Sequence, residues 1–271
     1  MRIVVERLDV VGSTNDVARE RLAAGVASPL LVRAESQAAG RGRRGRSWLD
    51  APGSALLQSL ALRAADLPLL REPARAWRAA AEFALAAADA IEDAAGAQLG
   101  TVALKWPNDL VLRNVEGGVT TGFRKVGGLL AEASGLGGDE ATLVVGLGLN
   151  VRGDPSRLDP ALAATATSLE LATGRPVDRE ALFDDLVARL EGRLGALAAG
   201  RFDVAGWRER QLLDGHEVEV EVAEGEIVTG LVVGHDGATG ALLLSVGEGP
   251  GAVERALGAG EVVRVRRIAA R

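Results

Sequence analysis

The chain has 271 residues, of which 48% are hydrophobic and 25% charged, so it is long enough for one large globular domain or two unequal ones. It has no cysteine, which excludes disulfides, a cysteine-ligated zinc site and a thiol nucleophile. The formal net charge is -6, the first residues carry charges, and no run of about 18 apolar residues occurs. We therefore expect a cytoplasmic protein without a membrane span.

The beginning of the chain predicts a strand followed by a helix. The helix begins near Ser13, Thr14 and Asn15 and ends near Ala24. Hydroxyl and amide side chains are good N-caps, and the same helix start presents polar groups and free N–H groups to a ligand. The sequence leaves both interpretations open. A buried strand is then predicted at residues 30–34, and Gln37 follows it.

Residues 40–48, the arginine loop, read Gly-Arg-Gly-Arg-Arg-Gly-Arg-Ser-Trp. A dense cationic segment in an acidic protein needs a local reason. Glycine lets backbone N–H groups approach an anion, and the guanidinium fork matches phosphate and carboxylate oxygens. The loop therefore favours a small anionic ligand. Two other interpretations stay open, a solvated loop and an arm that binds nucleic acid through its phosphates.

Only two of the 31 basic residues are lysines, Lys105 and Lys125. Arginine can replace lysine at exposed sites but not where a compact ammonium is needed, so both lysines are candidate functional residues. Lys105 begins the segment Lys-Trp-Pro-Asn-Asp between two short strands, in which Pro107 fixes the backbone around Asn108 and Asp109. A plain turn would explain the last three residues but not the lysine.

Two later strands carry glycines where a ligand could approach. Lys125 begins one strand, and Gly128 lies three residues further on. The next strand, residues 141–151, ends in Gly-Leu-Gly-Leu-Asn. Its alternate glycines leave one face bare, with room for a flat ring and with Asn150 at the edge. Packing or bulge glycines are the alternative interpretation.

The remaining pattern predicts scaffold. Helices are expected at residues 74–95, 178–198 and 203–212. After residue 213 the sequence pattern changes. Apolar and polar residues alternate in short predicted strands at residues 216–222, 227–233, 241–246 and 261–267, separated by glycine-rich turns. This predicts a domain at residues 1–212 and a small barrel at 213–271. Both histidines, His216 and His235, are interpreted as structural.

Taken together, these segments resemble the bacterial biotin protein ligases. The resemblance spans the chain and rests on residues 13–15, Gln37, the arginine loop, residues 105–109, Lys125 with Gly128, and residues 146–150. It implies an α+β fold, with a mixed β-sheet flanked by helices as in class II aminoacyl-tRNA synthetases and a C-terminal SH3-like β-barrel. It also implies that biotin and Mg-ATP form biotinyl-5′-adenylate, from which biotin passes to a lysine of the biotin carboxyl carrier domain of an acyl-CoA carboxylase.

The resemblance also implies roles for individual residues. Those expected to bind biotin are Ser13, Thr14, Asn15, Gln37, Gly40, Arg41, Gly42, Arg43, Lys125 and Gly128. Those expected to bind ATP are Arg44, Arg46, Lys105, Asn108 and Asn150, with Trp48 as a wall of either pocket. Asp109 is expected to hold Mg²⁺, and Lys125, Arg43 and Asp109 are the expected catalytic residues.

Two alternatives remain. A lipoate or octanoate protein ligase shares the implied fold, although the arginine loop with Lys-Trp-Pro-Asn-Asp favours biotin. A nucleic-acid-binding module would use the arginine loop and the barrel, but the acidic composition argues against it. The Ser-Thr-Asn motif begins at residue 13, so we expect the type of ligase without an N-terminal DNA-binding domain, and no DNA binding.

Overall fold

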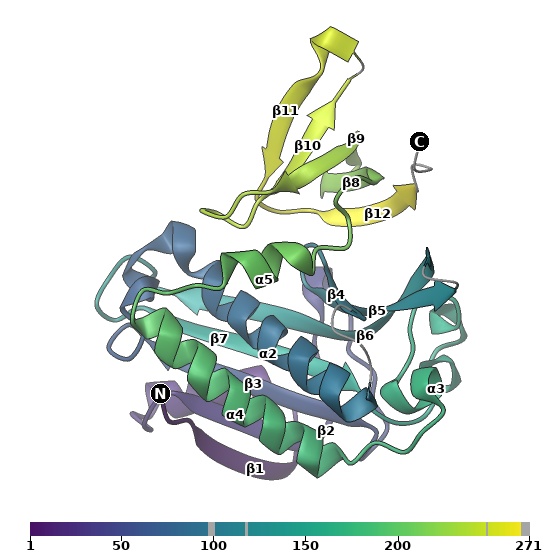
Figure 1. Cartoon of the computed structure of the whole chain (residues 1–271). Coiled ribbons are helices and arrows are strands. Elements are labelled where there is room, and N and C mark those ends of the chain that lie inside the picture. Colours follow the sequence, from purple (N-terminus) through teal and green to yellow (C-terminus); the bar gives the residue numbers. More distant parts are fainter. Residues whose placement is uncertain (97–100, 117–118, 248, 267–271) are drawn as a thin grey trace.

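The computed structural model describes residues 1–96, 101–116, 119–247 and 249–266. Its centre is a seven-stranded sheet in the order β1-β2-β3-β7-β6-β5-β4 (Figure 1). Only β1 and β2 are parallel to each other, and the other neighbours are antiparallel. The predicted mixed sheet is therefore confirmed. Its strands are β1 (Val4–Val11), β2 (Leu30–Gln37), β3 (Ala55–Arg63), β4 (Val102–Lys105), β5 (Asp109–Glu116), β6 (Val119–Ser134) and β7 (Thr142–Asn150).

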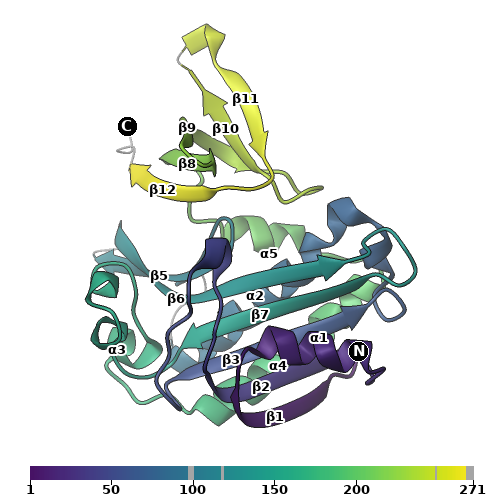
Figure 2. The ribbon, with the colours of Figure 1, turned by 180° about the vertical axis from the view of Figure 1, so that it is seen from behind.

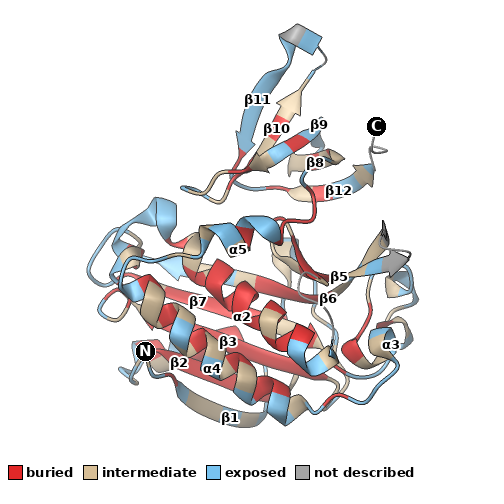
Figure 3. Ribbon diagram, viewed as in Figure 1, coloured by how far each residue is buried: buried red, intermediate tan, exposed pale blue. Residues whose placement is uncertain are grey.

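Helices cover both faces of this sheet. The helices α2 (Trp77–Ala95) and α4 (Arg179–Ala198) pack together on one face, and α1 (Thr14–Ala23) lies on the other (Figures 1 and 2). Alanines on α2 allow close packing, and Gly96 ends this helix in a left-handed conformation with φ 59°. Figure 3 shows that buried residues gather on β3, on β7 and along much of α2.

The shorter helical segments lie in the connections. They are the α-helices α3 (Leu169–Thr173) and α5 (Val204–Glu209), and the 3₁₀ turns Arg43–Gly45, Pro68–Arg71, Pro73–Arg75, Pro155–Arg157, Pro160–Leu162 and Gly249–Gly251. The helix predicted at residues 203–212 is shorter than expected, because the backbone of Arg210 and Leu212 bonds to Leu104 of β4 instead. The strands β5 and β6 form a hairpin, of which residues 117–118 lie outside the described residues. Lys125, predicted to begin a strand, lies inside β6 because this strand extends back through the hairpin.

The C-terminal part is a five-stranded antiparallel sheet in the order β11-β10-β9-β8-β12. In the described part of the chain β11 and β12 lie at opposite edges and are not paired, so the sheet does not close, and of the predicted small barrel the antiparallel sheet is confirmed. The sequence also missed β11, because its first four residues are exposed and show no apolar alternation. The strands are β8 (Glu217–Ala223), β9 (Glu226–His235), β10 (Leu242–Val246), β11 (Val253–Leu257) and β12 (Glu261–Arg266). Residue 267 lies outside the described residues.

The two sheets share a hydrophobic cluster. Leu213, Val218 and Val220 at the start of the C-terminal part pack in one cluster with Trp106 and Val111. This cluster holds the second sheet against β4 and β5, which carry the Lys-Trp-Pro-Asn-Asp segment. The predicted division at residues 212 and 213 stays a prediction. Among the described residues no helix is long and apolar enough to cross a membrane.

Candidate functional site

Two cavities meet at the side chains of Trp48 and Lys125, which line both of them. The small cavity, about 40 Å³, lies between the start of α1, Gln37 and the floor formed by β6 and β7. The large cavity, about 1150 Å³, is lined by β4, β5, residues 155–166 and β12 of the C-terminal sheet. The site thus offers two adjoining compartments with a shared wall.

Buried polar groups line the small cavity at the start of α1. The Thr14 N–H and hydroxyl both donate to Gln37 Oε1, at 2.7 and 3.0 Å. The Ser59 hydroxyl on β3 lies 2.7 Å from Thr14 Oγ1 and 2.6 Å from Asn15 Oδ1. The Ser13 side chain is buried without capping the helix, although it occupies the N-cap position. A buried polar group needs a partner, so the side chains of Thr14, Asn15, Gln37 and Ser59 fix one another, while Ser13 lines the cavity.

The bare face of β7 is filled by the protein's own side chains. A Cβ built at Gly148 would lie 2.5 Å from the Trp48 indole, and one built at Gly146 would overlap the Asn15 amide. The flat ring for which the glycines leave room is therefore Trp48 in this structure. Asn150, at the end of the same strand, donates from Nδ2 to the Thr167 carbonyl at 3.1 Å and lines the large cavity.

The arginine loop is a tight excursion closed by its own backbone. Gly42 N–H donates to Arg46 O at 2.7 Å, and Trp48 N–H donates to Gly40 O at 2.9 Å. Arg44 at the tip takes a left-handed conformation with φ 56°, which costs energy for a residue other than glycine. The backbone of the loop therefore has a defined conformation.

Each arginine of the loop contacts a protein acceptor. Arg41 forms two bonds to the Asp16 carboxylate, at 2.5 and 2.8 Å, and these bonds lower the pKa of Asp16 to about 2. Arg43 donates to the carbonyl of Gly260 at 3.1 Å. Two carboxylates of the C-terminal sheet complete the set. Glu221 pairs with Arg44, and Glu261 pairs with Arg46 at 2.5 Å. The C-terminal sheet thus holds the outer half of the loop.

The lysines and Asp109 form the wall between the loop and β4. Lys125 Nζ lies 2.6 Å from Asp109 Oδ1 and 5.8 Å from the centre of the Trp48 ring. Its backbone is fixed on both sides, since Lys125 N–H donates to Thr165 O and Thr167 N–H donates to Lys125 O, both at 2.8 Å. Burial lowers the pKa of Lys105, and the nearby Asp109 carboxylate opposes this shift. Two cations therefore converge on one carboxylate beside the large cavity.

The sequence of this chain is similar to those of known proteins. A model described as the biotin/lipoate A/B protein ligase family matches residues 8–150. The chain belongs to this family. It is 34% identical over 266 residues to the biotin–[acetyl-CoA-carboxylase] ligase of Mycobacterium tuberculosis, covering 96% of this chain and 90% of the relative. The corresponding ligase of Paracoccus denitrificans is 37% identical over 169 residues, covering 60% and 62%.

A solved structure resembles nearly the whole chain. The biotin protein ligase from Aquifex aeolicus in complex with biotin and ATP matches with a TM-score of 0.74 and 25% identity, covering 98% of this chain and 99% of that one. The resemblance to bacterial biotin protein ligases that the sequence predicts is thereby confirmed.

The structure brings together most of the residues expected from the ligase resemblance. Those lining the small cavity are Ser13, Thr14, Asn15, Gln37, Arg41, Trp48, Asn108, Lys125 and Gly128. Those lining the large cavity are Arg46, Trp48, Lys105, Asp109, Lys125 and Asn150. Asn108, expected beside ATP, lines the small cavity, where its amide donates to the Leu129 carbonyl at 2.7 Å. Gly40, Gly42, Arg43 and Arg44 line neither cavity. Gly40 is buried at the base of the arginine loop beside Gln37, and the other three lie further out along the loop.

Other residues in and around the two cavities escaped the sequence analysis. Ser59 lies in an apolar strand, where a hydroxyl is a usable signal of a polar contact. Glu132 accepts from Asn15 Nδ2 at 2.7 Å, and Glu261 and His216 of the C-terminal part line the large cavity. No local pattern marks these three residues. Among the described residues no cluster of three histidine, cysteine, aspartate or glutamate side chains suits a metal ion.

Proposed function

We propose that this chain is a biotin protein ligase. It activates biotin with ATP as biotinyl-5′-adenylate and transfers the biotinyl group to a lysine of the biotin carboxyl carrier domain of an acyl-CoA carboxylase. The observation that carries the proposal is that Lys125 and Trp48 line both cavities, in a chain that is similar to named biotin ligases over almost its full length. A reaction that joins two substrates needs two adjoining sites with a reactive group at their junction.

The small cavity suits biotin. Its hydroxyl and amide groups, from the buried Ser13 and Thr14 and the half-buried Gln37, are the kind of partner that the ureido ring of biotin requires. Arg41 and Lys125 supply positive charge for the carboxylate. The cavity of about 40 Å³ must widen to admit biotin, and Gly40, Gly42 and Arg43 then cover the bound ligand.

The large cavity suits the nucleotide. Lys105 and Arg46 provide cations for the phosphates, and Asn150 provides an amide for the adenine edge. Arg44 lies nearby on the loop, paired with Glu221. Trp48 lines both cavities and therefore forms the wall between the biotin site and the nucleotide site.

The chemistry explains why the junction is cationic. In the first step a biotin carboxylate oxygen attacks the α-phosphorus of ATP, and pyrophosphate leaves. Two anions must approach each other, and Lys125 with the arginines offsets their repulsion and stabilises the charge of the transition state. In the second step the acceptor amine attacks the acyl carbon, AMP leaves, and the amine proton passes to Asp109, which lies 2.6 Å from Lys125 Nζ.

Mg²⁺ fits this site through one protein ligand. Magnesium is commonly held by one or two carboxylates together with substrate phosphates. Asp109 lines the large cavity and supplies one such carboxylate. When bound there, the ion would neutralise charge on the phosphates, while Lys105 and Lys125 keep Asp109 oriented.

Two finer assignments of the fold belong to this proposal. We assign the catalytic part, residues 1–212, to the class II aminoacyl-tRNA synthetase-like architecture. We assign residues 213–271 to the SH3-like barrels in a partly open form. The second assignment is supported by a meander of five strands whose last strand pairs back with the first. An ATP-consuming ligase that modifies a metabolic enzyme is expected to act in the cytoplasm.

The direct test is pyrophosphate release by the purified chain with Mg-ATP and either biotin or lipoate, followed by transfer to a carrier domain. We expect biotin to support both steps and lipoate neither. A preference for lipoate or octanoate would overturn the substrate assignment. A DNA titration over a range of salt concentrations tests the predicted lack of DNA binding, since binding through the phosphate backbone would show a steep salt dependence.

A further inference from the structure

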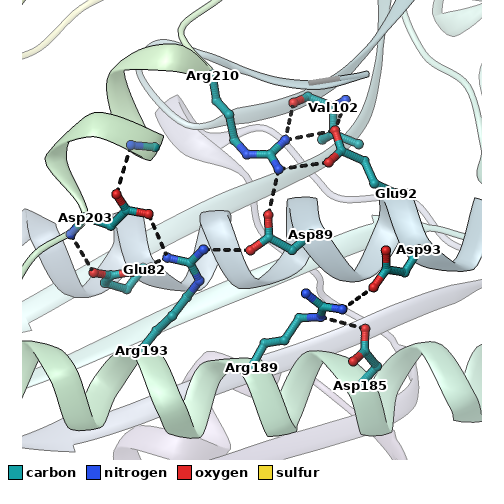
Figure 4. Close-up of polar contacts among 11 residues, drawn as sticks. Glu82, Asp89, Glu92, Asp93, Val102, Asp185, Arg189, Arg193, Asp203 and Arg210 are labelled. Carbon is teal, nitrogen blue, oxygen red and sulfur yellow. Dashed lines mark hydrogen bonds and ion pairs between the residues drawn. The ribbon is translucent and has the colours of Figure 1, made fainter. Parts of the chain in front are cut away.

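A buried ion-pair network ties α2, α4 and residues 203–210 together (Figure 4). Its centre is Arg210, whose side chain is 6% exposed. The two terminal nitrogens of Arg210 donate to both oxygens of Glu92, at 2.9 and 2.8 Å, and Nη2 also donates to Asp89 at 2.6 Å. A charge buried this deeply must be paired, so the guanidinium has one place to lie.

The same residue holds β4 in two ways. Its side chain donates to the Val102 carbonyl at 2.9 Å, while Glu92 accepts from the Val102 N–H at 2.9 Å. Its backbone carbonyl accepts from Leu104 N–H at 2.8 Å, and Leu212 N–H donates to Leu104 O at 3.0 Å. Residues 210–212 therefore form a short parallel pairing with β4 that is locked at its beginning by the buried guanidinium.

Both strands of this pairing lead directly into the large cavity. The residue after Leu104 is Lys105, and the residues at and after position 211 include Gln211, Asp214 and His216, all of which line the cavity. A shift of the pairing would move Lys105 and this wall together. The small cavity has no lining residue from either strand.

We propose that Arg210 is a positioning residue for nucleotide binding. It contacts no substrate in the proposed reaction. By fixing residues 210–212 against β4, Arg210 determines the positions of Lys105 and of the cavity wall formed by Gln211, Asp214 and His216. The inference rests on the proposed placement of ATP in that cavity.

Arg193 provides a matched control within the same network. It extends from α4, its side chain is 21% exposed, and it bonds to Glu82 at 3.0 Å and to Asp89 at 2.6 Å. It contacts neither β4 nor residues 210–212 among the contacts recorded for the described chain. Loss of either arginine leaves buried carboxylates unpaired, but only the loss of Arg210 releases the cavity wall.

The experiment compares Arg210→Met, Arg210→Lys and Arg193→Met in pyrophosphate release, each below its own thermal transition. For Arg210→Met we expect the KM for Mg-ATP to rise about tenfold and the KM for biotin to stay within about twofold, because a displacement of the order of 1 Å in a binding site is felt mainly by the ligand it contacts. Arg210→Lys should rescue in part, since lysine keeps the charge but cannot span Glu92, Asp89 and Val102 at once. Arg193→Met should lower stability with both KM values within about twofold.

An equal rise in KM for Mg-ATP in Arg193→Met and Arg210→Met would overturn the proposal, as would an equal rise in both KM values of Arg210→Met. If Arg210→Met fails to fold, Arg210→Lys decides alone, with an expected rise of about threefold for Mg-ATP and a refutation if there is none. A wild-type chain that activates lipoate and not biotin would refute the proposed function instead, and the comparison of KM values for Mg-ATP would still test Arg210.

Discussion

Replacing Gly148 with alanine should push the Trp48 indole away from β7 and damage both cavities at once. The added Cβ would lie 2.5, 2.6 and 2.9 Å from three indole atoms, distances that real Cβ atoms essentially never show. The indole is rigid, so the ring as a whole must retreat by about 1 Å. Because Trp48 lines both cavities, displacing its indole with one added methyl group should change both proposed substrate sites.

The size of the effect follows from two opposing contributions. Overpacking of this kind costs about 1–3 kcal/mol. Replacing glycine with alanine in a strand stabilises the folded state by about 0.5–1 kcal/mol, because the unfolded chain then has less conformational entropy to lose. We therefore expect Gly148→Ala to lower the free energy of unfolding by about 1–2 kcal/mol, and to raise the KM values for biotin and Mg-ATP about tenfold each.

Urea unfolding and pyrophosphate release measure these two quantities. Gly192→Ala is the matched control, because a Cβ at Gly192 meets nothing within 4 Å and the residue lies inside α4. That variant should gain about 0.5–1 kcal/mol of stability and keep wild-type kinetics. If Gly148→Ala were as stable as the wild type and had unchanged KM values, the indole would not lie over this strand and the shared wall would be refuted.

Three further outcomes follow from the site. Lys125→Met should slow single-turnover adenylate formation about 10²–10³-fold because a preplaced cation is lost, and a normal rate would remove this lysine from the mechanism. The Asp16 pKa of about 2 lies below the usual aspartate pKa of 3.8, so its stabilising effect is present above pH 3.8 and lost as the pH falls from about 4 to 2. An NMR titration of Arg41→Ala should show the Asp16 pKa return toward 3.8, and an unchanged pKa would contradict the pairing. Glu221→Gln should speed trypsin cleavage within the arginine loop, and unaltered cleavage would show that the pair of Glu221 with Arg44 does not hold the loop.

Local patterns predict the elements whose structure depends on neighbouring residues. The start of α1 at residue 14 follows from three polar N-terminal residues, and the turn between β4 and β5 follows from Pro107. The scarcity of lysine also carried information, because Lys105 and Lys125 do lie beside one carboxylate at the large cavity. In each case the prediction rested on a residue type whose chemical properties a similar amino acid would not provide at that position.

Long-range packing decided what the sequence left open. The alternate glycines of β7 predicted space for a flat ring beside this strand. Only the folded chain shows that the ring is the indole of Trp48, a residue of the arginine loop. Glu221 and Glu261 come near the loop because the C-terminal sheet packs on Trp106 and Val111. The sequence by itself thus determined which residue types this site contains, since local propensity and chemistry are written in adjacent positions. Which of them meet was decided by strand register and by the shared core, because these depend on contacts between segments far apart in the chain.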